Sequence, residues 1–172
     1  MRTVFILSFL IFCANYSGAQ KITIESKVDE FTGSTIITSS NLSLYVRGLG
    51  SETISYRVQK IDSNTILRIA YGTHDVFSVP EGGELMLLLD NKETFTVYSV
   101  DYDIAEPNFS AGPKWSARLS YISVADPQLK ILEKNKVTKI RFYFTGGFRE
   151  YEIKPKMADI LMKAVTMVNT KD

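Results

Sequence analysis

The chain has 172 residues, of which 45% are hydrophobic, 12% aromatic and 23% charged, and its formal net charge at pH 7 is +1. Its mean hydropathy of -0.01 and its freedom from biased tracts are typical of one compact globular domain. These properties exclude a disordered, collagen-like or coiled-coil protein.

The N-terminal segment predicts export. Residues 1–19 have the three parts of a secretory signal peptide: a positive start at Arg2, an apolar run over 4–14, and a polar stretch that ends in small residues. We expect cleavage before Gln20 and a periplasmic or secreted protein in which 20–172 form a single domain. No later segment approaches the ~20 apolar residues of a membrane-spanning helix, so no transmembrane segment is expected there.

Cleavage at that point would also determine the redox chemistry and the charge of the mature chain. Cys13 is the only cysteine and would be removed, so we expect neither a disulfide nor thiol chemistry. Loss of Arg2 leaves 19 basic residues against 19 acidic residues. Because this balance provides no overall field that attracts a polyanion, we expect no nucleic-acid partner.

The first recognisable strands form a hairpin. Residues 53–61 and 65–71 alternate apolar and polar side chains around turn residues at 62–64. The predicted register sets Val58 opposite Ile69 on the apolar face, as in an antiparallel pair with one wet side. The polar face of this hairpin would carry Arg57, Gln59 and Arg68.

Four further segments follow in the middle of the chain. Residues 84–89 and 94–100 are strand-like, and the first is apolar enough for a central strand covered on both faces. Residues 101–114 contain two prolines and a glycine and are expected to form a long loop. Residues 115–121 alternate again and predict another strand.

Two helices are expected in the last third. Asp126 is a suitable N-cap before a proline and Asn135 a suitable end, which predicts a short helix of about two turns between them. Pro155 begins a C-terminal helix whose apolar residues recur at i, i+3, i+4 and i+7 and should pack across the sheet. These residues are Met157, Ile160, Leu161, Ala164, Val165 and Val168.

A second hairpin lies between the two helices. Gly146 and Gly147 supply the positive φ values that a two-residue turn demands. A turn at this position would set Phe142 opposite Tyr151.

These elements predict an α+β domain. We expect about eight antiparallel strands in a bent sheet or open barrel, a short connecting helix and a C-terminal amphipathic helix packed on the sheet. The predicted core consists of Val58, Ile69, Leu87, Leu89, Leu119, Ile140, Phe142, Ile153, Leu161 and Val165.

The residues that carry chemistry form no catalytic constellation, so we expect no enzyme and no cofactor. His74 is the only histidine and is expected in a surface turn, because adjacent residues such as Asp75 point the other way on an extended chain. Asp101, Asp103 and Glu106 are either solvated loop acids or oxygen ligands for Ca²⁺, although the 12-residue EF-hand pattern is absent. The same three carboxylates could also supply a glycosidase pair.

Aromatic side chains mark the candidate contact site. Tyr102, Phe109 and Trp115 lie in or beside the expected long loop, where a ligand or a partner protein is more accessible than on a strand. Asn41 and Asn108 begin N-glycosylation sequons, which matter only in a host that glycosylates exported chains.

A short motif gives a resemblance. Residues 28–33 read Val-Asp-Glu-Phe-Thr-Gly and residues 137–141 read Val-Thr-Lys-Ile-Arg. With these segments the chain resembles small exported bacterial proteins of unassigned function that carry a similar D-x-F-T-G segment near the mature N-terminus. The resemblance implies a bacterial periplasmic or secreted protein and brings no activity or site residue with it.

Three functions remain open at this point. The leading hypothesis is an exported, non-catalytic binding or structural module of the periplasm or cell envelope, whose partner is an envelope protein or a small ligand. The alternative is a carrier of a small molecule or lipid with a cavity inside the bent sheet. A hydrolase that uses carboxylates is the further alternative.

Overall fold

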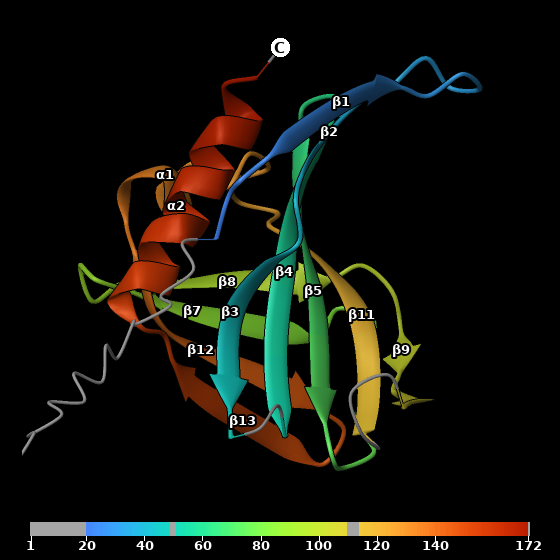
Figure 1. Ribbon diagram of the computed structural model, residues 1–172, viewed down its shortest axis with the longest axis vertical. Coiled ribbons are helices and arrows are strands. Elements are labelled where there is room, and N and C mark those ends of the chain that lie inside the picture. Colours follow the sequence, from blue (N-terminus) through green and yellow to red (C-terminus); the bar gives the residue numbers. More distant parts are fainter. Residues whose placement is uncertain (1–19, 49–50, 110–113, 172) are drawn as a thin grey trace, which may run out of the picture.

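The computed structural model describes residues 20–48, 51–109 and 114–171. The expected signal peptide and Cys13 lie outside the described residues. The described part of the chain contains thirteen strands and two helices (Figure 1). In chain order these are β1 (Ile24–Val28), β2 (Thr35–Ser39), β3 (Leu42–Arg47), β4 (Glu52–Ile61), β5 (Asn64–Thr73), β6 (Ser78–Val79), β7 (Glu84–Leu89), β8 (Thr94–Ser99), β9 (Asp103–Ile104), β10 (Glu106–Asn108), β11 (Lys114–Ile122), α1 (Ile131–Lys134), β12 (Val137–Phe144), β13 (Gly147–Glu152) and α2 (Pro155–Asn169).

The strands form one large antiparallel sheet that bends back on itself without closing, as in the bent-sheet form of the prediction. Its order is β1-β2-β4-β5-β11-β8-β7-β12-β13, with β3 on β4 and β10 on β11, while β6 and β9 form a separate pair. The bend follows β11, which pairs with β5 over Trp115–Tyr121 but with β8 only through Tyr121 and Ile122. In Figure 1 the strands β7, β8 and β12 therefore cross behind β3, β4, β5 and β11.

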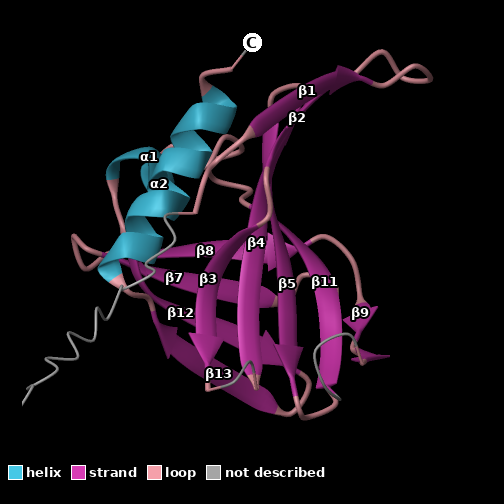
Figure 2. Ribbon diagram, in the orientation of Figure 1, coloured by secondary structure: helices cyan, strands magenta, loops and turns pink. Residues whose placement is uncertain are grey.

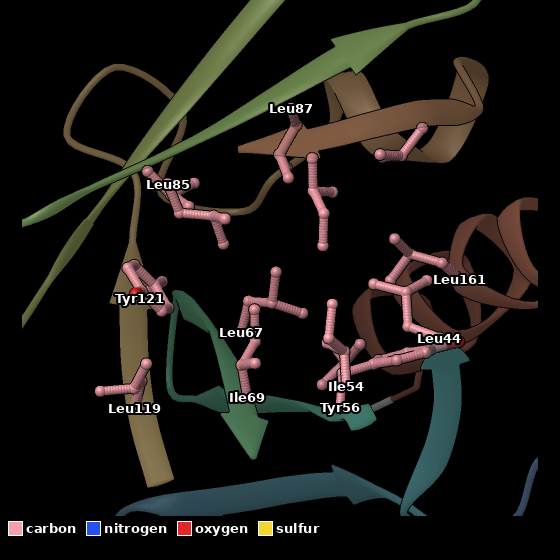
Figure 3. Packing of buried hydrophobic residues seen from close by; sticks show 14 of the residues in the cluster. Leu44, Ile54, Tyr56, Leu67, Ile69, Leu85, Leu87, Leu119, Tyr121 and Leu161 are labelled. Atoms are coloured by element: carbon pink, nitrogen blue, oxygen red, sulfur yellow. The ribbon is translucent and has the colours of Figure 1, made fainter. Parts of the chain in front are cut away.

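The inner faces of the two halves enclose the hydrophobic core. All ten predicted core residues are buried, with exposed fractions between 0% and 7%. In Figure 3, Ile54, Tyr56 and Leu67 face Leu85 and Leu87 from the opposite half. Alternation of apolar residues with period two produces this arrangement, because every second side chain of a strand points to the same face.

The C-terminal helix α2 packs on the sheet as predicted. Pro155 occupies its first turn, where a missing backbone N–H does no harm. Five of the six predicted apolar residues are buried, while Met157 is only partly buried against the core. The helix lies along one side of the bent sheet in Figure 2, in contact with β2, β3, β4 and β12. Leu161 points from α2 toward Leu44 of β3 (Figure 3).

The predicted register of the β4–β5 hairpin was wrong by two residues. Ile61 pairs with Asn64, so the turn consists of Asp62 and Ser63, and Val58 lies opposite Leu67. Asp62 takes a positive φ of 53°, which only a minority of non-glycine residues adopt. Because the shift is by two, the inner and outer faces were still predicted correctly.

The β12–β13 hairpin shows the same shift. Phe144 pairs with Gly147, which makes Thr145 and Gly146 the turn residues. Phe142 consequently lies opposite Arg149 and not Tyr151. Gly146, at φ +97°, supplies the left-handed conformation that the turn needs.

Two connecting segments differ from expectation. The loop expected at 101–114 contains the short strands β9 and β10. The short helix begins only at Ile131, with Lys130 and not Asp126 at the N-cap position, and it is four residues long. Asp126 still contacts its first residue, because its Oδ2 atom accepts the backbone N–H of Ile131 at 3.0 Å. Asn135 is the C-cap, as predicted.

Candidate functional site

The three aromatic residues that the sequence singled out do not share one environment. Tyr102 and Phe109 are exposed, at 61% and 74%, next to β9 and β10. Trp115 begins the inward-facing series of β11, where it is partly buried against the core and pairs with Thr73 of β5. Tyr102 and Phe109 therefore remain accessible for contact, whereas Trp115 contributes to packing.

The three acidic residues of the same segment serve the local backbone or face solvent. Asp103 Oδ2 accepts the backbone N–H of Arg118 at 3.2 Å at the edge of β11. Asp101 and Glu106 are exposed. Among the residues that the structure describes, no three His, Cys, Asp or Glu side chains form a group that could hold a metal ion.

His74 lies on the rim of a cleft of about 470 Å³ between the end of β5 and strand β13. The centre of this cleft is Arg149 of β13, whose Nη1 atom donates to Glu52 of β4 and to Thr73 of β5, each at 2.9 Å. Its Nη2 atom binds the carboxylate of Asp75. The arginine thus connects the last strand of the sheet to two strands of the other half.

Two tyrosines continue this network into the core. The hydroxyls of Tyr71 on β5 and Tyr151 on β13 lie 2.6 Å apart, and the ring of Tyr45 on β3 lies 4.7 Å from that of Tyr151. Burial, together with the hydrogen bond to Tyr71, raises the pKa of the Tyr151 phenol above its ordinary value. Because the polar groups of this cleft bind one another, we interpret the network as a side-chain clamp across the open edge of the sheet.

The β1–β2 hairpin projects beyond the body of the sheet, and its turn is the end of the hairpin that points away from α2 (Figure 1). Within the part of the chain that the structure describes, β1 pairs only with β2, and β2 pairs with β4 only over Ile36–Thr38. The outer part of the hairpin therefore has no described strand beside it. One edge of β1 faces no strand, although the Ile24 carbonyl at its start accepts a hydrogen bond from Lys171 Nζ at 3.2 Å.

The tip of this hairpin is the D-x-F-T-G segment, and it is held in one conformation by hydrogen bonds. The Oδ1 atom of Asp29 accepts the backbone N–H of Phe31 at 3.0 Å and that of Thr32 at 2.9 Å. The backbone N–H of Gly33 donates to Asp29 O at 2.8 Å, and that of Asp29 donates to Ser34 O at 2.9 Å. Gly33, at φ +73°, takes a left-handed conformation that suits glycine.

This turn presents an apolar side chain to solvent. Phe31 is 99% exposed, and Val28, which ends β1, is 63% exposed. Backbone hydrogen bonds to Thr32 and Phe31 lower the pKa of the Asp29 carboxyl, so the carboxylate form stabilises the turn. From the sequence the motif indicated only a resemblance, and Phe31 was not predicted as a contact residue. An aspartate that can form an Asx-turn, two residues before a phenylalanine, was the available signal.

Comparison with protein-family models, curated proteins and solved structures finds no match for this chain. Within the described ranges, neither helix has the length and apolarity required to cross a bilayer. Fold and surface together define the class: an α+β protein with a bent antiparallel sheet, a C-terminal helix packed on it and a projecting hairpin with an apolar tip.

Proposed function

We propose that this chain is an exported, non-catalytic binding module of the bacterial periplasm or cell envelope that engages a protein partner through the β1–β2 tip. The observation that carries the proposal is the complete exposure of Phe31 on a turn with its own hydrogen-bond framework. A single exposed apolar side chain on a protein surface is ordinary. Here a projecting, ordered turn keeps an aromatic side chain away from the rest of its own protein. This arrangement suits a residue that anchors an interface.

Two physical arguments favour a protein as the occupant. Large aromatic side chains supply much of the binding energy at interfaces when they enter a pocket of the partner. A turn that is already ordered loses little conformational entropy on binding, which increases the affinity that one anchor can provide. The free edge of β1 offers additional backbone hydrogen bonds to a strand of the partner.

The charges around Phe31 define the partner further. Asp29 and Glu30 lie in the turn, and Lys27 is the nearby cation in β1. The tip therefore carries a net negative charge and fits an apolar pocket with basic residues around it. The same charge disfavours contact with an anionic lipid surface.

The interior of the sheet favours a binding module over the carrier. Tyr56, Tyr71, Tyr121 and Phe142 are among the largest fully buried side chains, and they occupy the space that a carrier would need for its cargo. Stacking of Tyr71 on Phe142, with centroids 5.2 Å apart, is typical of a packed core.

The test is a comparison of two aromatic positions in the protein's own host. The tagged protein, the Phe31→Ala variant and the Phe148→Ala variant are purified from the envelope fraction, and each co-purifying protein is identified and produced alone. Phe148 is a matched control because it is 55% exposed at the far end of the sheet. Calorimetry with the purified partner should show affinity at least tenfold lower for Phe31→Ala and unchanged for Phe148→Ala. Equal affinity of all three proteins would refute the proposal.

Export is tested separately by intact mass and N-terminal sequencing of the protein from that host. A mature chain that begins at Gln20 and is found outside the cytoplasm is the expected result. A cytoplasmic chain that retains residues 1–19 would refute export without affecting the partner experiment.

A further inference from the structure

Three arginines lie side by side on the outer face of the sheet. Arg57 of β4 is directly opposite Arg68 of β5. Arg118 of β11 is opposite Ala70, which places it diagonally next to Arg68 on the same face. Like charges directly opposite each other destabilise a sheet, so this row works against folding.

The carboxylate of Asp103 lies beside the row, where its Oδ2 atom accepts the backbone N–H of Arg118 at 3.2 Å. Within the described ranges, none of the three guanidinium groups forms an ion pair. By strand register the same face carries Glu25 on β1 and Glu106 on β10, at opposite margins of the sheet. The positive charge is therefore concentrated on this face of a chain that has 20 basic and 19 acidic residues in all.

Neighbouring side chains hold the middle arginine in place. Arg68 Nε donates to Gln59 Oε1 at 2.9 Å, and Arg68 Nη1 donates to Ser120 Oγ at 2.6 Å. A guanidinium has five N–H donors, so Arg68 keeps three for another acceptor. This fixed fork is suited to bidentate contact with a carboxylate or phosphate group.

A hollow of about 440 Å³ lies over this row. Its walls include all three arginines together with the amide side chains of Asn41 and Gln59. The volume is that of a small-molecule site. The row crosses two interstrand spacings, about 10 Å, so two anionic groups of one molecule can each meet an arginine.

We propose that this hollow is a binding site for a small soluble molecule that carries two or more anionic groups, either carboxylates or phosphates. The arginines supply the charge, Arg68 supplies a preorganised fork, and the two amides add neutral hydrogen bonds. The site lies on the outside of the sheet, away from the β1–β2 tip, and is independent of the proposed protein contact.

The experiment follows the arginine Nε–Hε NMR signals of the full protein while citrate or pyrophosphate is added at constant ionic strength. Acetate is the monovalent control. Saturable shifts of the Arg57, Arg68 and Arg118 signals with either probe are expected, and the stronger probe identifies carboxylate or phosphate as the preferred group. Acetate should bind at least tenfold more weakly than the better of the two probes, because it supplies only one anionic group to a row of three arginines.

Substitutions then distinguish binding at this site from non-specific attraction between opposite charges. Arg57→Gln and Arg118→Gln should each weaken binding about tenfold, the effect of losing one charge-assisted contact. Arg47→Gln removes the same charge outside the hollow and should leave the affinity within about twofold. All three residues are exposed, so the variants should retain the wild-type melting temperature or exceed it.

Three results would overturn the proposal. The first is the absence of saturable binding of both citrate and pyrophosphate to the wild-type protein. The second is equal weakening by Arg47→Gln and Arg57→Gln, which would indicate unspecific charge. The third is binding to vesicles with anionic headgroups that neither soluble probe displaces, which would make the face a membrane contact.

Discussion

Arg149 on β13 and Glu52 on β4 lie 2.9 Å apart across the edge where the sheet remains open. Backbone hydrogen bonds do not join these strands, so side chains make the connection that a closed barrel would make with its main chain. The Glu52 side chain is only 14% exposed, which weakens screening of the pair by water. The clamp therefore contributes to holding the two halves of the sheet together.

The first prediction concerns this clamp. Arg149→Leu leaves the Glu52 carboxylate poorly solvated and without its strongest partner, so the free energy of unfolding should fall by about 1–3 kcal/mol. Arg141→Leu is the control, because Arg141 pairs with Glu150 on the exposed face of the same hairpin. Its loss should be less than about 1 kcal/mol. Urea denaturation measures both, and equal losses would mean that the clamp is an ordinary surface pair.

A second prediction arises from two tyrosines in the core. The hydroxyls of Tyr56 and Tyr121 have no hydrogen-bond partner among the described residues, and burial raises the pKa of both phenols. Tyr121→Phe should raise the free energy of unfolding by about 1 kcal/mol, because it removes a buried polar group that gains nothing from folding. Tyr71→Phe should lower it by about 1 kcal/mol, since it removes the hydrogen bond to the Tyr151 hydroxyl and an acceptor of Arg149 Nη1. The two variants must differ in sign in thermal or urea denaturation for this account to hold.

A third prediction tests the packing of α2. Leu161 is 1% exposed and faces the sheet, so Leu161→Ala should lower the free energy of unfolding by about 2–5 kcal/mol. Met167, on the same helix, is 41% exposed, and Met167→Ala should change the free energy by less than about 0.5 kcal/mol. A loss below about 1 kcal/mol for Leu161→Ala would mean that the helix is peripheral to the core.

The fourth prediction concerns the pH dependence of the hairpin tip. The pKa of Asp29 lies below its ordinary value of 3.8 because its carboxylate accepts the backbone N–H groups of Thr32 and Phe31. A carboxyl whose folded-state pKa is lowered stabilises the turn fully above the unfolded value, and this contribution is lost as the pH falls through the lower folded value. NMR titration should place the Asp29 midpoint below 3.8, with the amide signals of Phe31 and Thr32 following it.

The Asp29→Asn variant is the control for that titration. The low-pH change in the two amide signals should disappear in this variant, because the asparagine side chain does not titrate. An Asp29 midpoint at or above 3.8 in the wild-type protein would contradict the hydrogen-bonded turn.

The sequence predicted the faces of the strands better than their partners. Apolar alternation identified Val58, Ile69 and Phe142 as core, and it also assigned Arg57 and Arg68 to the outer face. A register shift of two residues preserves faces, so the pattern was insensitive to the misplaced turns. The turn at Asp62 depended on a positive φ at a non-glycine residue, which composition does not reveal.

Long-range strand pairing determines where the candidate surfaces lie, more than it determines which residues form the core. Arg118 joins Arg57 and Arg68 only because β11 pairs with β5. Five other strands separate β5 from β11 in the sequence, and none of them lies between the two in the sheet. Phe31 is exposed because β1 and β2 extend past the end of β4, which no local pattern determines. Tyr102 and Phe109 were predicted from loop composition, and their accessibility follows from the same local signal.

The most direct test of the proposed function is site-specific photo-crosslinking in the host, with a photoreactive phenylalanine analogue placed singly at positions 31, 109 and 148. The account predicts that position 31 captures one defined protein, and that excess purified wild-type chain reduces this capture while the Phe31→Ala variant does not. Capture of the same protein at position 109 or 148 with equal or greater yield would contradict it, and would move the contact away from the β1–β2 tip.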